Sequence, residues 1–583
     1  MRKGLVILAG VAASLIPLVA ARAETPTPEP NFAAPVVPGR GCVPQAGNPY
    51  ERDVYRQEGW AKPTFARYPG VCQRLKFAFG PIAVKPGQND VLVQPITIEK
   101  PAQDGFITRI RPDLVDENGN VPPIEQVHLH HGTWLSEPNY GTGPFFASGE
   151  EKTIAPFPRG YGMPIHATDQ WQLLYMVHSA VPQTKLVWIT YDVDFVPSAA
   201  AKRLGLRPAY PVWLDVRPSA YPVFNVQRGF GSGQACTWPR QACAFLDPWG
   251  RQTVGQGMPG SGTGTDWRFP NRGGALGAVS NFQGGTLIGI GGHLHPGGIS
   301  NDIDLVRGGK AKRIYTGVAQ YWDHKDHTKV GGPPTSWDYS MAITGLPRWG
   351  VHVKPGDILR SNATYDTTIQ STYENMGIAV AFIAPDLPNG KHTAKGVDAF
   401  KAPFDASATC KSGGLAKGVL CDKGVVTHGH MPEAGNYGNA AGTLTSKRAG
   451  PITQVDIAAF TYLQGDLTRV DSSGIPTVKL GQNLQFVNAD AAADIYHTIT
   501  SCAFPCTGPT GVAFPLADGR SSLGRQIDFD TAELGIGPPI GPAKNAVGWT
   551  IPITPQNGFR AGSVLTYYCR IHPFMRGAVA VQG

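Results

Sequence analysis

The stretch YYCRIHPFMRGAVAV at residues 567–581 decides how the C-terminal part of the chain folds. It begins inside the β-rich run SVLTYYC and ends inside the strand-like run GAVAVQG. The proline-containing segment between these runs has only the length of a loop that joins two neighbouring strands. The pattern therefore predicts a strand, a short loop and a final strand, with Cys569, His572 and Met575 delivered to one end of a sheet.

These three side chains complete a ligand set when His497, in the run IYHTIT, is added. A blue copper site takes a thiolate, two imidazoles and a weak axial thioether. We predict that one type 1 copper is bound by four residues: His497, Cys569, His572 and Met575. The set leaves no open coordination position, so this copper is expected to move one electron and not to transform a substrate.

The cysteine count supports this use of Cys569. The chain has 9 cysteines, an odd number, and an exported protein pairs most of its cysteines. Proximity alone suggests four local disulfides: Cys42–Cys72, Cys236–Cys243, Cys410–Cys421 and Cys502–Cys506. Cys569 is then left over, and a metal gives such a thiol a use in an oxidising compartment.

The region 451–583 resembles the cupredoxins, close to plastocyanin and pseudoazurin. The resemblance rests on the run LGQNLQFVNAD before His497, on the C-x2-H-x2-M spacing and on the glycine-containing last strand. It implies a Greek-key β-sandwich that works as an electron-transfer domain. The insertion that carries Cys502 and Cys506 is a departure from the simplest members of this family.

The remaining chain also reads as β-structure. The runs WQLLYMVHSA, KLVWITYDVDFV, GTLIGIGGHLH and MGIAVAFIAP are rich in β-branched and aromatic residues and are bounded by turn formers. The 72 glycines and 52 prolines suit many short strands joined by turns, and no helical period is sustained. We therefore predict an all-β protein with three β domains.

The N-terminus has the pattern of a secretory signal peptide. Arg2 and Lys3 precede an apolar run, and Ala21-Arg22-Ala23 has the small-x-small form of a cleavage site. We predict a signal peptide at 1–23 and a secreted or periplasmic location, with a membrane anchor as the alternative. The net charge of +8 comes from scattered basic residues, so no nucleic-acid partner is expected. No membrane span is expected in the chain after removal of the signal peptide.

Histidines gather at two places upstream of residue 385. The run EQVHLHHGTWL holds His128, His130 and His131, and the run GGHLHPGG holds His293 and His295. Residues i and i+2 of a strand face the same side, so His293 and His295 are able to bind one ion together. Adding the thioether of a methionine to two imidazoles makes a soft site that suits Cu(I) better than zinc.

The order HH, VH, HxH and Met over 76–385 resembles the copper type II, ascorbate-dependent monooxygenases, the class of peptidylglycine α-hydroxylating monooxygenase and dopamine β-monooxygenase. The resemblance implies two tandem β-sandwiches, at 76–205 and 206–385. It also implies two further mononuclear coppers. The ligand sets it implies are His130, His131 and His178 for electron transfer, and His293, His295 and Met376 for oxygen activation and C–H hydroxylation. His128 is an alternative to His131 as a ligand.

Three residues depart from the peptide hydroxylases of that family. Gly291 stands where they have an arginine that grips a substrate carboxylate, and Ile378 and Val380 stand where they have polar substrate contacts. A peptide carboxylate is therefore not the expected substrate. Three hypotheses remain: a copper monooxygenase fed by its own cupredoxin, a non-enzymatic copper-binding electron-transfer protein, and an envelope β-sandwich protein that retains only the blue copper.

Two other segments complete the predicted organisation. Residues 24–75 are expected to form an irregular arm, and residues 386–450 a linker or a disulfide-stapled subdomain. The expected partners are an external electron donor, either an ascorbate-like reductant or a redox protein, and a small-molecule substrate that the sequence does not identify.

Overall fold

The protein is described from a computed structural model. The described residues are 42, 68–85, 89–120, 122, 127–137, 143–149, 155–179, 183–216, 224–226, 235–238, 266–270, 279, 281–295, 298–318, 343–345, 350–366, 372–401, 415–416, 419–422, 444–468, 474–493, 495, 497–501, 504, 531, 534, 547–569, 572 and 575–583. The predicted all-β class is confirmed, because β-sheets packed as sandwiches make up nearly all of this structure. None of the helices in these ranges has the length and hydrophobicity needed to span a membrane.

The first unit is a sandwich of two sheets, in which the strand pairs are antiparallel except for the parallel pair of β10 with β7. Its outer sheet has the order β1 (Gln73–Val84), β9 (Lys185–Pro197), β3 (Gly105–Asp116), β7 (Tyr161–Ile165) and β10 (Arg207–Pro208), with β6 (Ala155–Pro156) paired to β3. Its inner sheet has the order β2 (Asn89–Ile98), β8 (Gln170–Ser179), β4 (Val127–Glu137) and β5 (Gly143–Gly149). Trp134, Trp171 and Tyr191 are fully buried between the sheets and form the centre of this core.

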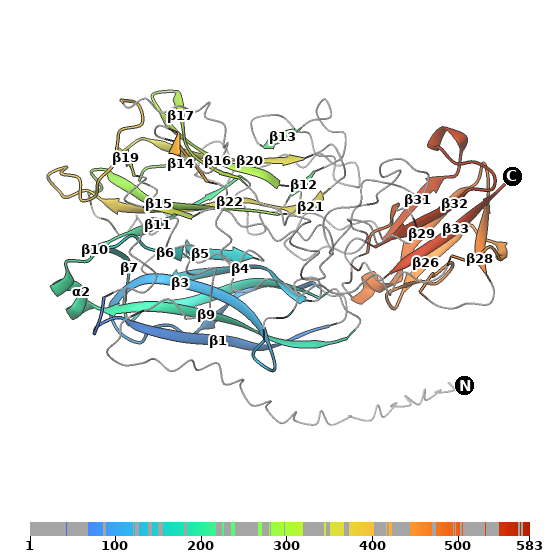
Figure 1. The fold of residues 1–583 in the computed structure, drawn as a ribbon, viewed down its shortest axis with the longest axis horizontal. Coiled ribbons are helices and arrows are strands. Elements are labelled where there is room, and N and C mark those ends of the chain that lie inside the picture. The colour runs from blue at the N-terminus through green and yellow to red at the C-terminus, as the bar shows by residue number, and fades with distance from the viewer. Residues whose placement is uncertain are drawn as a thin grey trace, which may run out of the picture.

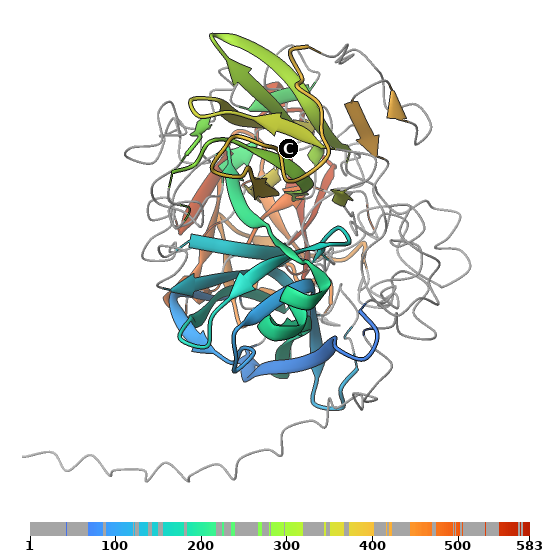
Figure 2. The ribbon, with the colours of Figure 1, turned by 90° about the vertical axis from the view of Figure 1, so that its left-hand side faces the viewer.

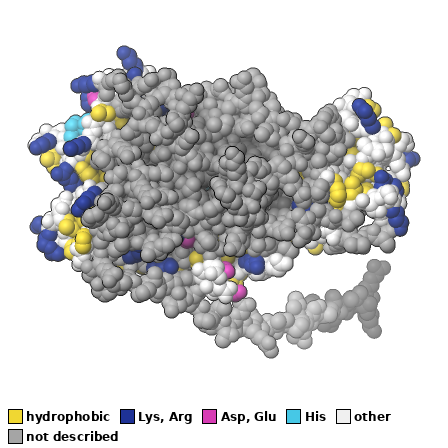
Figure 3. Space-filling model, viewed as in Figure 1, with side chains coloured by type: hydrophobic (Ala, Val, Ile, Leu, Met, Phe, Trp, Pro, Cys, Tyr) yellow, Lys and Arg dark blue, Asp and Glu magenta, His cyan; other side chains and the backbone are white. Residues whose placement is uncertain are grey.

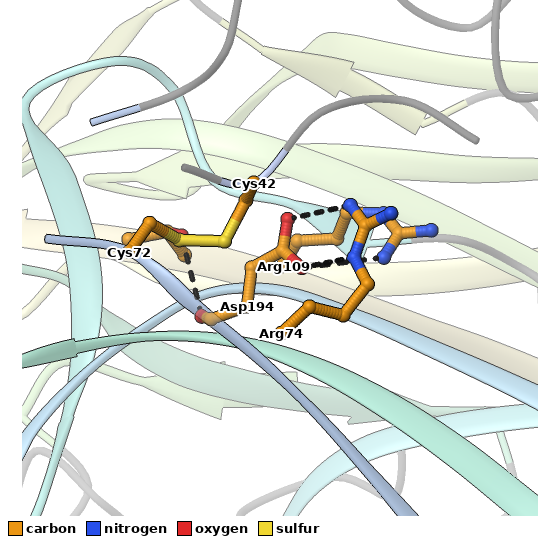
Figure 4. Close-up of a disulfide and its surroundings, with 6 residues drawn as sticks. Cys42, Cys72, Arg74, Arg109 and Asp194 are labelled. Atoms are coloured by element: carbon orange, nitrogen blue, oxygen red, sulfur yellow. Dashed lines mark hydrogen bonds and ion pairs between the residues drawn. A yellow bond between two sulfur atoms is a disulfide. The ribbon is translucent and has the colours of Figure 1, made fainter. Parts of the chain in front are cut away.

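A disulfide fastens the N-terminal arm to this first unit. Cys42 and Cys72 are bonded, as the cysteine spacing predicted, and they lie beside α2 (Ser198–Leu204). Next to the disulfide, the buried carboxylate of Asp194 faces the guanidinium groups of Arg74 and Arg109 (Figure 4). The other three predicted disulfides each have a cysteine outside the described residues and stay predictions.

The second unit is also built from packed sheets. One sheet has the order β11 (Tyr210–Asp215), β22 (Gly377–Pro385), β15 (Gly285–Leu294) and β18 (Ile343–Gly345), with β19 (Val351–Val353) paired to β15. The other has the order β13 (Ala235–Trp238), β20 (Ile358–Asp366), β16 (Gly298–Arg307), β17 (Lys310–Val318), β24 (Val419–Asp422) and β23 (Leu415–Ala416), with β14 (Asp266–Arg268) paired to β20. A small sheet pairs β12 (Phe224–Val226) with β21 (Thr372–Asn375).

The first and second units are stacked on each other, with β4 and β5 of the first unit nearest to β11, β15 and β22 of the second (Figure 1). Apolar side chains fill the contact. The rings of Phe157 and Phe382 lie 4.4 Å apart between centroids, and Ile288 of the second unit is buried in the core of the first. The layers that carry the upstream histidines are therefore pressed against each other.

The C-terminal unit is a third sandwich. One sheet has the order β25 (Arg448–Pro451), β28 (Ile475–Lys479), β33 (Arg576–Gln582), β32 (Val564–Tyr568) and β30 (Thr500–Ser501). The other has the order β27 (Thr461–Tyr462), β26 (Gln454–Ala458), β29 (Asn483–Asn488) and β31 (Gly548–Pro552). Two short 3-10 helices, η3 (Ala489–Ala493) and η4 (Pro555–Asn557), belong to this unit.

This third unit lies against one end of the two stacked units, at the right of Figure 1 and behind them in Figure 2. Val216, Leu294 and Ala363 of the second unit belong to the same buried apolar cluster as Cys569 and Met575. The end of the C-terminal sandwich that carries the predicted copper ligands is thus the end that the other units cover.

At the opposite end of the molecule, the charged side chains of the described surface are mostly Lys and Arg, and hydrophobic side chains lie between them (Figure 3). The predicted domain boundaries stay predictions, although the strands group in a similar way. The segment 386–450, expected as a linker or subdomain, contributes β23 and β24, and β24 pairs in parallel with β17 of the second unit.

Candidate metal centre

The four predicted ligands of the C-terminal site lie together in the interior. The Nδ1 atoms of His497 and His572 are 3.0 Å apart and lie 3.9 and 3.7 Å from the Sγ atom of Cys569. All three side chains are fully buried, and Met575 is buried beside Cys569 in the same apolar cluster. Two imidazoles and a thiol that converge in a dry interior, next to a thioether, make the donor set that suits copper.

The sandwich positions these side chains through a tight turn between its last two strands. Cys569 directly follows β32, and Met575 directly precedes β33. The Cys569 N–H donates to the Met575 carbonyl at 3.2 Å, and the Met575 N–H donates to the His572 carbonyl at 2.8 Å. The turn therefore returns the chain onto itself and directs its side chains to one point.

The sulfur of Cys569 receives backbone hydrogen bonds. The N–H groups of Thr498 and His572 donate to Sγ at 3.2 and 3.4 Å. Burial raises the pKa of the Cys569 thiol, but the positive charge of His572 and the hydrogen bonds of both imidazoles outweigh it, so the pKa is well below its ordinary value. The site is built to hold a thiolate, which is the form that binds a metal.

Asp490, at the start of η3, orients His497. The Nε2–H of His497 donates to the Asp490 carboxylate at 2.9 Å, which turns Nδ1 toward the sulfur. The carboxylate also accepts the N–H groups of Ala459 and Phe460, two residues with left-handed φ values of 49° and 58°. Burial lowers the pKa of His497, but the hydrogen bonds to Asp490 and Cys569 and the negative charges of these two groups together outweigh it and raise the pKa overall.

A bulge in β4 places two of the upstream imidazoles on one side. His128 pairs with His178 of β8 and His131 pairs with Met176, so His130 is the extra residue between them. A bulge re-aims the side chains around it. Here the Nδ1 atoms of the adjacent residues His130 and His131 come within 3.3 Å of each other, which regular alternation along a strand would prevent.

His295, which directly follows β15, joins these two histidines from the facing unit. Its ring centroid lies 4.4 Å from that of His130, and one ligand atom from each of His130, His131 and His295 lies within 4.8 Å of the others. His293, two residues earlier on β15, lies 4.8 Å from His295 between ring centroids. Burial, and then the neighbouring imidazoles, lower the pKa of His130 well below its ordinary value.

His128 and His178 form a separate pair between the two metal-ligand groups. Their ring centroids are 4.9 Å apart, and the ring of His178 lies 6.1 Å from that of His572 in the C-terminal unit. Among the described residues, the implied set His130, His131 and His178 does not form a compact group of the kind that His130 and His131 form with His295. The structure thus brings together histidines that the family resemblance assigned to two different coppers.

Gly291 lies on β15, and Ile378 and Val380 lie on β22, which Met376 directly precedes. Leu294 pairs with Gly377 at the end of the two strands, and Met376 and His295 are the next residues of their chains beyond this pair. Gly291 pairs with Val380, and Ile378 packs with Met376 and the half-buried Trp213. Met376 therefore has apolar neighbours in Ile378 and Trp213.

Sequence reasoning missed two residues of the C-terminal site. Asp490 stands 7 residues before His497 in the sequence and touches it, but one acidic residue near a histidine is too common a pattern to predict that contact. Thr498 acts through its backbone N–H, which no side-chain motif reveals.

Comparisons with known proteins give matches among solved structures only. No protein-family model and no curated protein matches the chain. The chain is similar to the Cu(I) form of an amicyanin mutant, at 21% identity over 24% of this chain and 89% of that chain, with a TM-score of 0.13. It is similar to the oxidized state of another amicyanin mutant at 21% identity over 22% of this chain and 80% of that chain, with a TM-score of 0.13. The reduced state of a third mutant matches at 23% identity over 24% and 89% of the two chains, with a TM-score of 0.12.

Proposed function

We propose that this chain is an exported copper redox protein whose C-terminal unit holds a type 1 copper through His497, Cys569, His572 and Met575. The observation that carries the proposal is the buried convergence of two imidazole nitrogens on one thiol sulfur, all within 4.8 Å of one another. Copper in such a site alternates between Cu(I) and Cu(II) and so passes one electron at a time.

The chain's own residues prepare this exchange. Two backbone N–H groups hold the sulfur as a thiolate, and Asp490 fixes the ring of His497, so the ligands are already in place in either oxidation state. A surrounding apolar cluster keeps water away from the sulfur. Pre-positioned ligands reduce the rearrangement that accompanies each electron transfer.

Copper loading followed by absorption and electron paramagnetic resonance spectroscopy tests the proposal. We expect the intense blue band of a copper–thiolate bond in the wild type and its loss in Cys569→Ser. Met376→Ile serves as a control that alters a buried sulfur side chain outside this site and should keep the band. A colourless copper-loaded wild type, or a blue Cys569→Ser variant, would refute the assignment.

A second proposed activity is oxygen-dependent hydroxylation at the upstream histidines, with electrons from the C-terminal copper. Met376 and His295 directly adjoin the last β15–β22 pair, Leu294 with Gly377, and Met376 packs against the apolar Ile378, which favours it. The proposed partners are an external reductant, either ascorbate-like or a redox protein, and an apolar small molecule. Oxygen uptake with ascorbate and candidate substrates tests it. Uptake that the Met376→Ile substitution abolishes supports hydroxylation, and no oxygen uptake by the wild type favours a non-enzymatic electron-transfer protein.

Secretion or residence in the periplasm is part of the same proposal. The disulfide between Cys42 and Cys72 supports it, because such bonds persist in oxidising compartments. Cell fractionation of the producing organism, with detection of the N-terminus that begins after Ala23, tests both the location and the predicted cleavage of residues 1–23.

A further inference from the structure

The histidines of the first and second units meet where the two units are pressed together. His130 and His131 come from β4 of the first unit, and His295 directly follows β15 of the second. One nitrogen of each ring lies within 4.8 Å of the other two. Residues more than 160 positions apart in the chain therefore present three ring nitrogens to one point.

The fold brings these three rings together at a cost in burial and in strand pairing. Burying an imidazole in an apolar interior costs free energy unless its nitrogens are bonded, and His130 and His295 are fully buried. The bulge at His130 also gives up a regular pairing of β4 with β8 in order to bring the nitrogens of His130 and His131 within 3.3 Å. Three imidazoles in this arrangement are a ligand set for a transition-metal ion.

A row of further imidazoles joins this triad to the C-terminal site. From the ring of His130 to that of His128 the centroid distance is 6.2 Å, from His128 to His178 it is 4.9 Å, and from His178 to His572 it is 6.1 Å. The row ends on His572, which is a ligand of the proposed type 1 copper.

We propose that His130, His131 and His295 together hold one copper ion, and that His128 and His178 conduct electrons between this ion and the C-terminal copper. This inference rests on the proposed function of the C-terminal site. In the transfer, the copper held by Cys569 is oxidised from Cu(I) to Cu(II), and the copper of the triad is reduced from Cu(II) to Cu(I). One electron moves, and no bond to an atom of the chain is made or broken.

The row of rings favours copper over zinc as the ion that His130, His131 and His295 bind. Imidazoles suit both ions, but zinc has no redox chemistry and would give the connection to His572 no use. Copper(II) also binds nitrogen ligands more tightly than zinc does in the general affinity order of divalent metals. His131 is half-buried, so the triad has one side turned toward the outside of the core.

Two histidines separate this proposal from the ligand sets implied by the monooxygenase resemblance. In those sets His178 and His293 are copper ligands. In the triad proposed here neither is a ligand: His178 belongs to the electron path, and His293 is a neighbour of His295. Substitution of either residue should therefore lower the copper content if the monooxygenase-like ligand sets are right, and leave it unchanged if the triad is right.

Copper counting on the purified, copper-loaded full-length chain tests the triad. We expect His295→Ala to lose one equivalent of copper relative to the wild type and to keep the blue band. The matched control, His293→Ala two residues earlier in the chain, should keep all the copper of the wild type. Loss of copper in His293→Ala, or full retention in His295→Ala, would overturn the triad. His131→Ala, at the half-buried ring, repeats the test with less risk to the core and should also lose one equivalent.

The electron path has its own test. In His178→Phe we expect unchanged copper content and an unchanged blue band, but a severalfold slower return of that band after flash reduction of the C-terminal copper. An unchanged rate would refute the path, and a lost copper would refute the triad. Zinc that displaces the triad copper in equimolar competition would also refute the assignment. Because the blue band reports the C-terminal site alone, its absence in the wild type would mark failure of the proposed function and not of the triad.

Discussion

Replacing Asp490 by asparagine should weaken copper binding although Asp490 is not itself a ligand. The carboxylate accepts three hydrogen bonds: Oδ1 accepts the N–H of Ala459 at 2.8 Å, and Oδ2 accepts Phe460 N–H at 3.1 Å and His497 Nε2–H at 2.9 Å. An asparagine has one oxygen and one NH2 group. Whichever way it is turned, its NH2 faces at least one N–H donor, and at least one of the three bonds is lost.

The size of the effect follows from these contacts. A hydrogen bond that involves a charged group contributes about 1.5 to 3 kcal/mol. Substitution of the residue that orients a metal-binding histidine typically costs about 10- to 100-fold in metal affinity. That factor corresponds to about 1.4 to 2.7 kcal/mol, so the two estimates agree. We expect the Asp490→Asn variant to bind copper about 10- to 100-fold more weakly than the wild type.

A competitive titration against a copper chelator, followed by the blue band, measures this affinity. Asp456→Asn is the matched control, because Asp456 accepts side-chain hydrogen bonds from Gln454 and Gln464 on the surface of the same unit and touches no proposed ligand. Chemical unfolding of both metal-free variants separates loss of affinity from loss of folding. Equal copper affinity of the Asp490→Asn and Asp456→Asn variants would refute the reasoning.

Three further substitutions have defined outcomes. Gly577→Ala should destabilise the C-terminal unit by about 1 to 3 kcal/mol in chemical denaturation, because the added Cβ would lie 2.4 Å from the buried ring of Tyr567; unchanged stability would contradict this contact. Met575→Leu should keep the blue band but raise the reduction potential in a redox titration, because a weak axial donor to Cu(II) is removed; a colourless variant would speak against its axial role. Burial raises the pKa of Asp398, but hydrogen bonds, one of them from Arg307, outweigh burial and lower the pKa below 3.8. The ionised carboxylate therefore stabilises the fold above pH 3.8, and this contribution is lost as the pH falls through the folded-state pKa. Arg307→Met should therefore flatten the fall of the unfolding free energy on acidification, and an equally steep fall would count against the ion pair.

The convergence of the C-terminal side chains was predictable because its signal in the sequence is local. Cys569, His572 and Met575 lie within one turn, and the odd cysteine count singled out the thiol. The strands on either side follow from runs of β-branched and aromatic residues, which favour sheets wherever they are buried. The all-β class was accessible for the same reason.

The grouping of the upstream histidines was not predictable in this way. It depends on the bulge at His130, which changes which side of β4 the neighbouring rings face, and no residue pattern announces a bulge of this kind. It also depends on the packing of one unit on another, which brings His295 to His130 across a sheet-to-sheet contact. Pattern reasoning within one strand captures the pair His293 and His295 but not the partner that approaches from another sheet.

The covered end of the C-terminal sandwich has a kinetic consequence. Because the ring of His572 is fully buried and faces His178 of the same chain, a soluble acceptor has no direct access to that edge of the proposed copper site. In the proposed transfer, an electron that leaves through His572 passes to His178 within the molecule, at a rate that dilution does not change. An outside donor has to approach by a different face, so the proposed copper is reduced through one face and oxidised through another.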